Sequence, residues 1–394
     1  MNMKLNNKGF AITGILYGLL ILFALLVGSY LTILTARKNR LDGIVENIEN
    51  EYNGNDKAKK TLTQTITDLY NNAQKKPAKN NGITYNTAPS VSLMNDRLGG
   101  TTTDLDGGNI RYYGANPNNY VYFNCSDYSN QTSSTCETWR IIGVFDGKLK
   151  LIRGSQIGKY SWDNKNMSTG AEDGWGKNAW TTARLMKLLN PSDYYKVDSN
   201  DNNLGQSLYY NSASGKCYSG DGNATKDCDF TNTGIKNDET RNMIAETTYN
   251  LGGHNIATVY PNQIYEYEKG IKKCSSCTYN TTWAGKIALA YPSDYGYAVD
   301  LNQCKDKTLK NYNDSTCTSN NWMKAILGTS SSGWLLTPYS GNSYGVWYVS
   351  LSGNLSCGSN SCNVGGVSPV LYLNSDISIE KGDGSSSNPY KLSV

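Results

Sequence analysis

The stretch Trp139-Arg-Ile-Ile-Gly-Val-Phe-Asp-Gly-Lys-Leu-Lys-Leu-Ile152 carries the clearest structural signal in the chain. Two apolar runs, 139–145 and 148–152, flank the dipeptide Asp146-Gly147, which is a strong signal for a tight hairpin turn. A third run of the same kind, 120–123, precedes them. The pattern predicts strands of an antiparallel meander.

Outward from this hairpin, short helical patterns alternate with short strand patterns. Apolar side chains recur at helical spacing over 180–189, and 240–249 is a second candidate helix. Toward the C-terminus, 345–350 and 367–373 have the pattern of strands, with loops of Gly, Ser and Asn between them. Helices between sheet segments predict an α+β fold with short antiparallel strands and long loops.

The N-terminal part is dominated by an uncharged apolar run from Phe10 to Ala36. As a helix this run would be about 40 Å long, enough to cross a hydrocarbon core of about 30 Å. We therefore expect a transmembrane helix over 10–36, a helical stalk over 37–75 and a polar linker over 76–103. The remaining residues, 104–394, are expected to form the folded domain.

Composition narrows the range of functions. The net charge is +4, and no block of five or more Lys or Arg occurs, so the sequence lacks the footprint of a nucleic-acid-binding protein. The single histidine, His254, excludes sites that need two imidazoles. The 30 Tyr and eight Trp argue for an ordered aromatic core, because disordered chains are poor in aromatics.

Ten cysteines follow residue 124, in pairs that lie close together in the sequence. Short separations and an even count are typical of local disulfides formed in an oxidising compartment. We expect sequential pairing, although spacing alone does not prove the connectivity. The expected bridges join Cys125 to Cys136, Cys217 to Cys228, Cys274 to Cys277, Cys304 to Cys317 and Cys357 to Cys362.

The N-terminus carries a first resemblance. A basic leader ending in Lys8-Gly9-Phe10, followed by a long apolar segment, resembles the class III signal of type IV prepilins. The resemblance implies a leader over 1–9, cleavage between Gly9 and Phe10, and a prepilin peptidase and other pilins as partners. Gly14 departs from the family, in which this position usually holds a Glu that pairs with a neighbouring subunit, so entry into a filament is left open.

The folded part carries a second resemblance, to Firmicutes surface proteins that join a prepilin-type N-terminus to an uncharacterised domain. That domain resembles the C-type-lectin-like fold shared with sulfatase-modifying-factor relatives, and the family carries no established activity to transfer. Ser368 departs from the pattern, since such domains commonly have Arg before this Pro. The resemblance spans about 109–390 and rests on Arg111-Tyr-Tyr-Gly-Ala-Asn-Pro-Asn-Asn-Tyr-Val-Tyr-Phe-Asn124, Trp139-Arg-Ile-Ile-Gly-Val144, Met186-Lys-Leu-Leu-Asn190, Gly285-Lys-Ile-Ala-Leu-Ala-Tyr-Pro-Ser-Asp-Tyr-Gly-Tyr-Ala298, Trp334-Leu-Leu-Thr-Pro338, Gly366-Val-Ser-Pro-Val-Leu-Tyr-Leu373 and Gly382-Asp-Gly-Ser-Ser-Ser-Asn-Pro-Tyr390.

Three acidic clusters are candidate calcium sites, because Ca²⁺ prefers oxygen ligands. They lie at 104–109, at 198–202 and at Asp221, Asp227 and Asp229. None has the closing Glu of an EF-hand, and such clusters are more often solvated turns than calcium sites. No cofactor is therefore expected, and calcium is the one ion left open.

The remaining candidates for chemistry favour structural roles. Cys274 and Cys277 have thioredoxin-like spacing, but the sequence around them is that of a loop rather than a helix start. His254 is expected in a loop and Asp294 in a buried turn. No catalytic residue is assigned, and an enzyme is not expected.

Aromatic residues among small polar residues near the C-terminus have the composition of adaptable binding loops. The candidates for ligand binding are Tyr339, Tyr344, Trp347 and Tyr348. The sequence thus predicts a single-pass cell-membrane protein with a cytoplasmic N-terminus. Its extracellular domain would bind an external protein or glycan, as an adhesin or minor pilin. The alternatives are an extracellular enzyme of the sulfatase-modifying type and a purely structural envelope protein.

Overall fold

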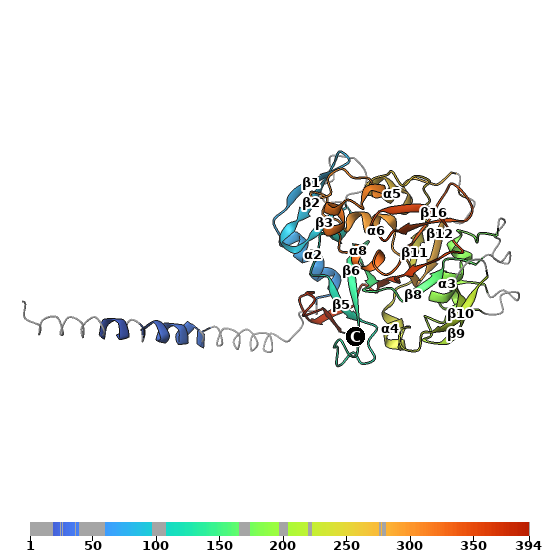
Figure 1. The fold of residues 1–394 in the computed structure, drawn as a ribbon. Coiled ribbons are helices and arrows are strands. Elements are labelled where there is room, and N and C mark those ends of the chain that lie inside the picture. The colour runs from blue at the N-terminus through green and yellow to red at the C-terminus, as the bar shows by residue number, and fades with distance from the viewer. Residues whose placement is uncertain are drawn as a thin grey trace, which may run out of the picture. The chain divides into compact units, whose positions relative to one another are not determined.

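The computed structural model describes residues 19–23, 25, 27–35, 37–38, 60–96, 108–164, 174–196, 204–219, 223–275, 277 and 281–393. The chain divides into two compact units, Met1–Lys59 and Lys60–Val394. Figure 1 shows the elements of both, and each unit is described by itself.

In the first unit, the described residues between 19 and 38 are helical, with exposed apolar side chains. A membrane span needs about 20 consecutive apolar helical residues. Among the described residues, Ser29, Thr32 and Thr35 are polar, and their hydroxyls donate to backbone carbonyls one turn earlier. Within the described part of the chain, no helix has the length and apolar character to cross a bilayer. The predicted transmembrane helix over 10–36, and the single-pass membrane localisation built on it, are therefore wrong.

The second unit is built around a large antiparallel sheet in the order β1-β2-β3-β4-β6-β7-β18-β13, with β5 paired to β6. The predicted hairpin 139–152 lies at its centre as β6 and β7, which confirms the strands expected there. The strands of this sheet are β1 (Lys76–Asn80), β2 (Ile83–Ala88), β3 (Leu93–Asn95), β4 (Ile110–Tyr112), β5 (Tyr120–Phe123), β6 (Glu137–Phe145), β7 (Lys148–Arg153), β13 (Ile287–Ala288) and β18 (Val370–Leu373).

A second sheet runs in the order β16-β15-β14-β17-β8, and three two-stranded ribbons complete the strands described. Only the β14–β17 pair among the described strand pairs is parallel. The strands of the second sheet are β8 (Gly158–Ser161), β14 (Gly333–Pro338), β15 (Gly345–Val349), β16 (Leu355–Asn360) and β17 (Val364–Val367). The ribbons are β9 (Ser214–Tyr218) with β10 (Thr225–Asp229), β11 (Thr247–Asn250) with β12 (Thr282–Gly285), and β19 (Ser378–Lys381) with β20 (Lys391–Ser393).

The helices of this unit are short, and the longest described one, α2, has 11 residues. The α-helices are α2 (Leu62–Asn72), α3 (Arg184–Leu189), α4 (Asp238–Met243), α5 (Pro261–Glu268), α6 (Pro292–Tyr297), α7 (Ser315–Ser319) and α8 (Lys324–Leu327). The 3₁₀ turns are η1 (Pro89–Val91), η3 (Trp180–Thr182), η4 (Ser192–Tyr194) and η5 (Leu309–Asn311).

The fold class predicted from the sequence, α+β with a long N-terminal transmembrane and stalk helix, is therefore wrong, since the described domain is mostly β. The helix expected over 240–249 ends at Met243, and its second half becomes β11, because Thr247, Thr248 and Tyr249 favour strand. The helix expected over 180–189 divides into η3 and α3, and α3 ends before Pro191, which disfavours helix at the residue before it.

The domain also begins earlier than residue 104. Residues 62–72, assigned to a stalk, form α2, whose Leu62, Ile66 and Tyr70 are buried in the core. Much of the expected linker forms β1, β2 and β3 of the main sheet. The turn between β1 and β2 is Asn81-Gly82, with φ of 49° and 74°, a hairpin signal of the same kind as Asp146-Gly147.

Two positions explain why the central hairpin folds as it does. Asp146 and Gly147 have φ of 48° and 76°, the left-handed conformation that a two-residue hairpin turn requires. Gly143 faces β4, and a Cβ placed there would lie 2.1 Å from the Ile110 carbonyl oxygen. Only glycine lets β4 and β6 approach so closely.

The core is aromatic, as the composition predicts. Every tryptophan except Trp175 is buried. A chain of edge and tilted ring contacts runs from Trp162 through Trp180, Trp283 and Tyr249 to Tyr372. These rings provide much of the apolar area that the thin aliphatic composition does not.

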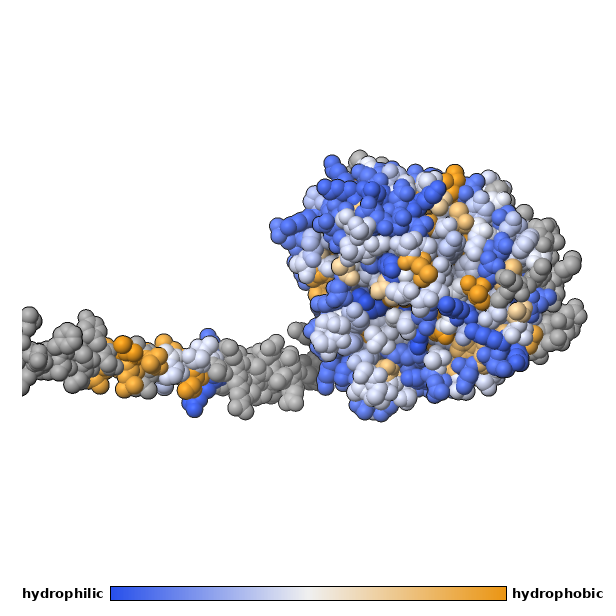
Figure 2. All heavy atoms as spheres, in the orientation of Figure 1, coloured by the Kyte–Doolittle hydropathy of each residue, from blue (hydrophilic) through white to orange (hydrophobic). Residues whose placement is uncertain are grey.

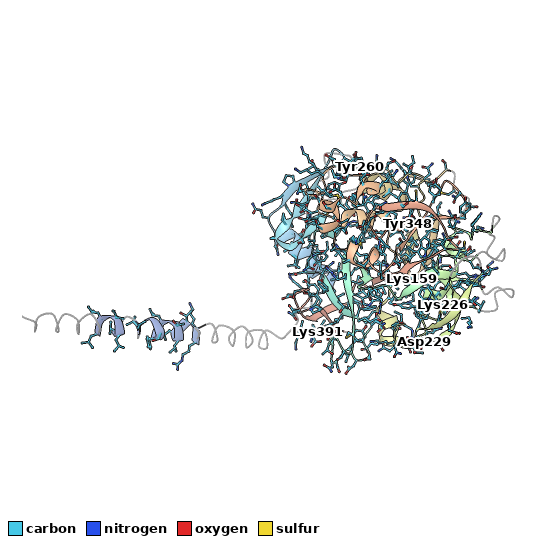
Figure 3. All side chains as sticks on the ribbon, viewed as in Figure 1. Lys159, Lys226, Asp229, Tyr260, Tyr348 and Lys391 are labelled. Carbon is cyan, nitrogen blue, oxygen red and sulfur yellow. A yellow bond between two sulfur atoms is a disulfide. The ribbon has the colours of Figure 1, made fainter. Side chains whose placement is uncertain are left out.

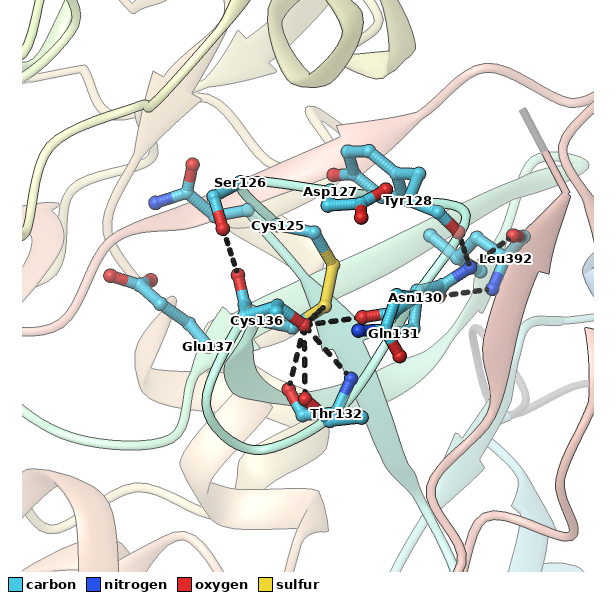
Figure 4. The surroundings of a disulfide bond; sticks show 12 residues. Cys125, Ser126, Asp127, Tyr128, Asn130, Gln131, Thr132, Cys136, Glu137 and Leu392 are labelled. Carbon is cyan, nitrogen blue, oxygen red and sulfur yellow. Dashed lines mark hydrogen bonds between the residues drawn. A yellow bond between two sulfur atoms is a disulfide. The ribbon is translucent and has the colours of Figure 1, made fainter.

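Four of the expected disulfides are present: Cys125–Cys136, Cys217–Cys228, Cys274–Cys277 and Cys304–Cys317. Figure 4 shows the first of them, which closes a loop beside the C-terminal strand β20. Gln131 in this loop donates from Nε2 to the Leu392 carbonyl oxygen at 2.7 Å and accepts from the Leu392 N–H at 2.8 Å. The loop is thus fixed both covalently and by hydrogen bonds.

The surface of the second unit is mostly polar. On the face drawn in Figure 2, hydrophobic residues form small separate groups among hydrophilic ones. Lys226, labelled in Figure 3 beside Lys159, donates to the Lys159 carbonyl oxygen at 3.0 Å and lies 4.3 Å from the centre of the Tyr160 ring. This contact attaches the β9–β10 ribbon to β8.

Candidate functional site

The four residues predicted to bind a ligand lie close together in the chain, at β14, β15 and the turn between them, but they do not share one environment. Trp347 is fully buried and donates from Nε1 to the His254 carbonyl oxygen at 3.1 Å. Tyr348, labelled in Figure 3, is partly exposed and packs edge-on against Trp334. Trp347 is thus part of the core.

The other two predicted residues, Tyr339 and Tyr344, are partly exposed. The Tyr344 ring lies 6.4 Å from that of Trp175, the one exposed tryptophan. Neither residue lines the cavity described below. Their role in binding stays a prediction.

The fifth expected disulfide is absent, because Cys357 and Cys362 carry free thiols. Cys357 lies on β16, opposite Trp347 at a register shift of the β15–β16 pair, and Cys362 is buried in the turn that follows. Burial raises the pKa of the Cys357 thiol, although an N–H from Ala257 partly offsets this. The sequential pairing predicted for these two cysteines is wrong.

The other candidates have mixed outcomes. Gly9 and Phe10, the processing site, lie outside the described residues, as do 198–202, Asp221 and most of 104–109. Asp227 pairs with Lys216, and Asp229 accepts hydrogen bonds from Thr231. Among the residues that the structure describes, no group of three or more His, Cys, Asp or Glu is arranged to hold a metal.

A cavity of the domain lies elsewhere, between the main sheet and the segment 247–294. It has a volume of about 250 Å³, and we call it the Arg111–Glu268 cavity. Its lining residues come from β4, β6, β7, β11, α5, β18 and the turns beside them: Arg111, Phe145, Asp146, Lys148, Lys150, Thr247, Thr248, Asn250, Tyr265, Glu268, Lys269, Tyr291 and Tyr372.

Buried ion pairs form the floor of this cavity. Asp294, in the first turn of α6, accepts from Arg111 Nη1 at 2.9 Å and from Lys150 Nζ at 2.5 Å. Arg111 Nε donates to Asp96 Oδ2 at 2.6 Å. All four side chains are at most 1% exposed, and two cations balance two anions.

This network also fixes the surrounding backbone. Asp294 caps its own helix, since its Oδ2 accepts the Tyr291 N–H at 2.8 Å. Asp96 accepts the Asn109 N–H at 2.8 Å, which connects the segment after β3 to the segment before β4. Such buried pairs are stable only when their remaining hydrogen-bonding capacity is met by further partners.

The pKa values of the two cations, Lys150 and Arg111, shift in opposite directions. Desolvation lowers the pKa of Lys150, partly offset by Asp294. For Arg111, desolvation acts in the same direction, but the carboxylates of Asp96 and Asp294, together with the Tyr265 hydroxyl, outweigh it, and the pKa is raised well above its usual value. The Arg111 guanidinium therefore stays protonated and positively charged in the floor of the cavity.

Glu268, the last residue of α5, is 3% exposed. Its Oε1 accepts the Ser293 N–H at 3.3 Å. The pKa of Glu268 is raised from 4.5 to about 8, chiefly by desolvation and also by the charge of Asp294, against a side-chain hydrogen bond with Ser293 and the charges of Arg111 and Lys150. At neutral pH this carboxyl is predominantly protonated, so it adds no net charge to the floor.

Three lining residues each have a polar atom that is shielded from solvent and has no hydrogen-bond partner within the described residues (Arg111 Nη2, Glu268 Oε2 and Thr247 Oγ1), and similar atoms, such as Tyr209 Oη and Thr337 Oγ1, lie elsewhere in the domain. An unmet buried polar atom costs about 1–3 kcal/mol, so natural domains hold few of them.

Aromatic rings surround these polar groups. Arg111 lies 4.5 Å from the centre of the Phe145 ring and 4.6 Å from that of Tyr265. Lys150 lies 4.4 Å from the centre of the Tyr291 ring. The cavity therefore joins apolar rings with a few convergent polar atoms, which is the usual make-up of a ligand site.

Sequence reasoning singled out only Asp294 of this group, as a buried turn residue, and the structure confirms its burial. Arg111 and Lys150 lie within strand patterns, where a charged side chain ordinarily faces water. Their spacing from Glu268 exceeds 100 positions in the sequence, so no local motif connects them. The one sequence signal that could have identified Arg111 and Lys150 is a charged side chain in the middle of an otherwise apolar strand.

Comparison with known proteins identifies no relative of this chain. No family model matches the chain, no curated protein matches it, and no solved structure resembles it significantly.

Proposed function

We propose that this protein is an extracytoplasmic recognition protein, in the manner of an adhesin. Its domain of residues 60–394 would bind an external partner through the Arg111–Glu268 cavity. The carrying observation is the cavity itself, which has a volume of about 250 Å³ and is lined by aromatic rings beside buried charged groups.

The cysteines support the proposed compartment. Four disulfides support an oxidising environment, because cytosolic thiols are kept reduced. The ligand is therefore one met outside the cytoplasm. Prepilin-type processing and association with pilins remain predictions that depend on the N-terminal residues.

The test is a binding screen followed by localisation. The full chain is heated with amino acids, small carboxylates, amines, and neutral or acidic sugars, and binding is detected as a rise in Tm. Hydrogen exchange with the best compound then locates the site, with increased protection expected over 247–250 and 261–268. If no compound raises Tm, or if protection maps elsewhere, the cavity is not the binding site. Failure of the whole panel would favour the structural envelope alternative.

A second candidate function, an extracellular enzyme of the sulfatase-modifying type, is favoured by one observation. Relatives of that type use a reactive cysteine pair, and Cys357 and Cys362 carry free thiols. The raised pKa of Cys357 weighs against it, because the thiolate is the reactive form.

Alkylation of the denatured, unreduced protein should label these two cysteines and no others, as judged by mass spectrometry. In the native protein we expect labelling to be slow at neutral pH. Rapid native labelling at Cys357 would favour the enzyme over the recognition protein.

A further inference from the structure

Lys150 and Asp294 form the most deeply buried pair of a lysine with a carboxylate in the described part of the chain. Lys150 Nζ lies 2.5 Å from Asp294 Oδ2, and both side chains are at most 1% exposed. Every other lysine–carboxylate pair within the described residues has side chains at least 20% exposed. Those pairs are screened by water, whereas burial of Lys150 and Asp294 is costly for both charges.

Aromatic rings enclose the amine of this pair. Lys150 Nζ lies 4.4 Å from the centre of the Tyr291 ring and 5.0 Å from that of the Phe145 ring. Tyr372 contributes a third ring, with its centre at 5.6 Å. Apolar surroundings disfavour the charged form of an amine, and desolvation lowers the pKa of Lys150. The neutral form is the nucleophile, so the surroundings favour reaction at Nζ.

The Asp294 carboxyl is positioned for attack by this amine. With 2.5 Å between Nζ and Oδ2, the carboxyl carbon lies one bond further away, near the separation of about 3–3.5 Å from which bonds form in intramolecular reactions. Arg111 Nη1 donates to Oδ1 at 2.9 Å, so it would stabilise negative charge on this oxygen when the carbon becomes tetrahedral. The Tyr291 N–H donates to Oδ2 at 2.8 Å and holds the oxygen that would leave.

A second buried carboxyl, that of Glu268, lies beside the pair. Glu268 Oε1 accepts the N–H of Ser293, the residue before Asp294, at 3.3 Å. Glu268 also interacts electrostatically with both partners of the pair. A carboxyl in this place can relay a proton between the amine and the leaving oxygen.

The charges that remain after a condensation of Lys150 with Asp294 would still balance. An amide between these two side chains removes one buried charge of each sign. Arg111 then stays paired with Asp96, which accepts from Arg111 Nε at 2.6 Å. The condensation therefore removes a desolvated ion pair without leaving an unpaired charge in the interior.

We propose that Lys150 and Asp294 form an intramolecular isopeptide bond that joins β7 to α6. A bond forms between Lys150 Nζ and Asp294 Cγ, and the Cγ–Oδ2 bond breaks. Two protons pass from the Nζ ammonium to Oδ2, with Glu268 as the relay, and Oδ2 leaves as water into the adjacent cavity, which Lys150 lines. The ion pair thus becomes one neutral amide and one water molecule, and no oxidant, reductant or other co-reactant takes part. This modification does not depend on the ligand of the cavity.

Mass spectrometry of the full chain, denatured and with its disulfides reduced, tests the proposal. We expect a mass one water below that of the unmodified chain. Trypsin should release peptide 149–153 joined to peptide 287–305, because cleavage after Lys150 is blocked when its amine is acylated. Fragmentation of the joined peptide should place the link at Lys150 and Asp294.

Three variants locate the reacting groups. Lys150→Arg keeps the positive charge without the amine, and Asp294→Ala removes the carboxyl, so neither should lose water or give the joined peptide. Lys216→Arg alters an exposed pair with Asp227 and is the control, in which the joined peptide should persist. Glu268→Gln should lower the joined fraction found soon after synthesis. The bond itself does not titrate, so its absence changes the free energy of unfolding by the same amount at every pH.

The native digest alone decides the proposal, whether or not the variants fold. Release of 149–150 and 287–305 as separate peptides from the native protein, at full mass, would overturn it. A water lost within a single linear peptide, as from a cyclised Asp-Gly pair, would overturn it equally. An unchanged joined fraction in Glu268→Gln would reject Glu268 as the proton relay.

Discussion

Glu268→Gln tests the electrostatics of the cavity most directly. The substitution keeps the shape of the protonated carboxyl and removes its titration. In the folded protein the pKa of Glu268 is raised to about 8 from 4.5 by burial. The folded state therefore retains a proton over a pH range in which the unfolded state has lost it.

The sign follows from this proton balance. Because the folded state binds more protons between pH 4.5 and 8, this group's contribution to the free energy of unfolding falls as pH rises through that range. The slope is about 1.4 kcal/mol per pH unit in the middle of the window. Between pH 5 and pH 8 the native protein should lose roughly 3 to 4 kcal/mol relative to Glu268→Gln.

The assay is urea unfolding of both proteins at half-unit steps from pH 5 to pH 9. The difference between variant and native protein isolates Glu268, since Asp294, Arg111 and Lys150 are common to both. Glu239→Gln, at an exposed position, is the control and should give a difference that hardly changes with pH. If the difference in free energy of unfolding between Glu268→Gln and the native protein does not change with pH, Glu268 is not both buried and protonated. The floor of the cavity is then not neutral.

The remaining predictions concern stability. Gly143→Ala places a Cβ against the neighbouring strand and should cost about 1–3 kcal/mol or more, measured as a lower urea midpoint at an unchanged slope; an unaltered midpoint would contradict the close approach of β4 and β6. Gln131→Ala removes both hydrogen bonds to Leu392 and should cost about 1–3 kcal/mol, with faster hydrogen exchange confined to the C-terminal strand and its neighbours. The double variant Cys304→Ala/Cys317→Ala opens a 13-residue separation and should lower stability by about 3 kcal/mol, and an equal Tm would show that the bridge does not restrain the unfolded chain.

Local sequence patterns predicted those features of the fold that depend on neighbours in the chain. Asp146-Gly147 specifies a left-handed turn whatever surrounds it, so the central hairpin could be placed. Short-range cysteine pairs predicted four loops for the same reason. The pair Cys357 and Cys362 shows the limit, because separation along the chain says nothing about the direction in which two side chains on a strand and its turn point.

Sequence patterns gave wrong predictions where contacts between distant segments decide the secondary structure. The segment 76–95 is polar and contains proline, which favours a linker, yet it completes the edge of a sheet that needs backbone partners. Residues 247–250 continue a helical pattern, yet pairing with β12 holds them as a strand. In both cases hydrogen bonds to a distant segment outweigh a weak local preference.

The sequence by itself determined an aromatic, disulfide-bonded domain built on antiparallel hairpins, because turn geometry, loop closure and the burial of Tyr and Trp follow from residue type and spacing. Only the tertiary structure decided where a ligand can bind. Arg111, Lys150, Glu268 and Asp294 are brought together from β4, β7, α5 and α6, and their charges and proton occupancy are set by mutual distance and exclusion of water. Those quantities exist only once the chain has folded.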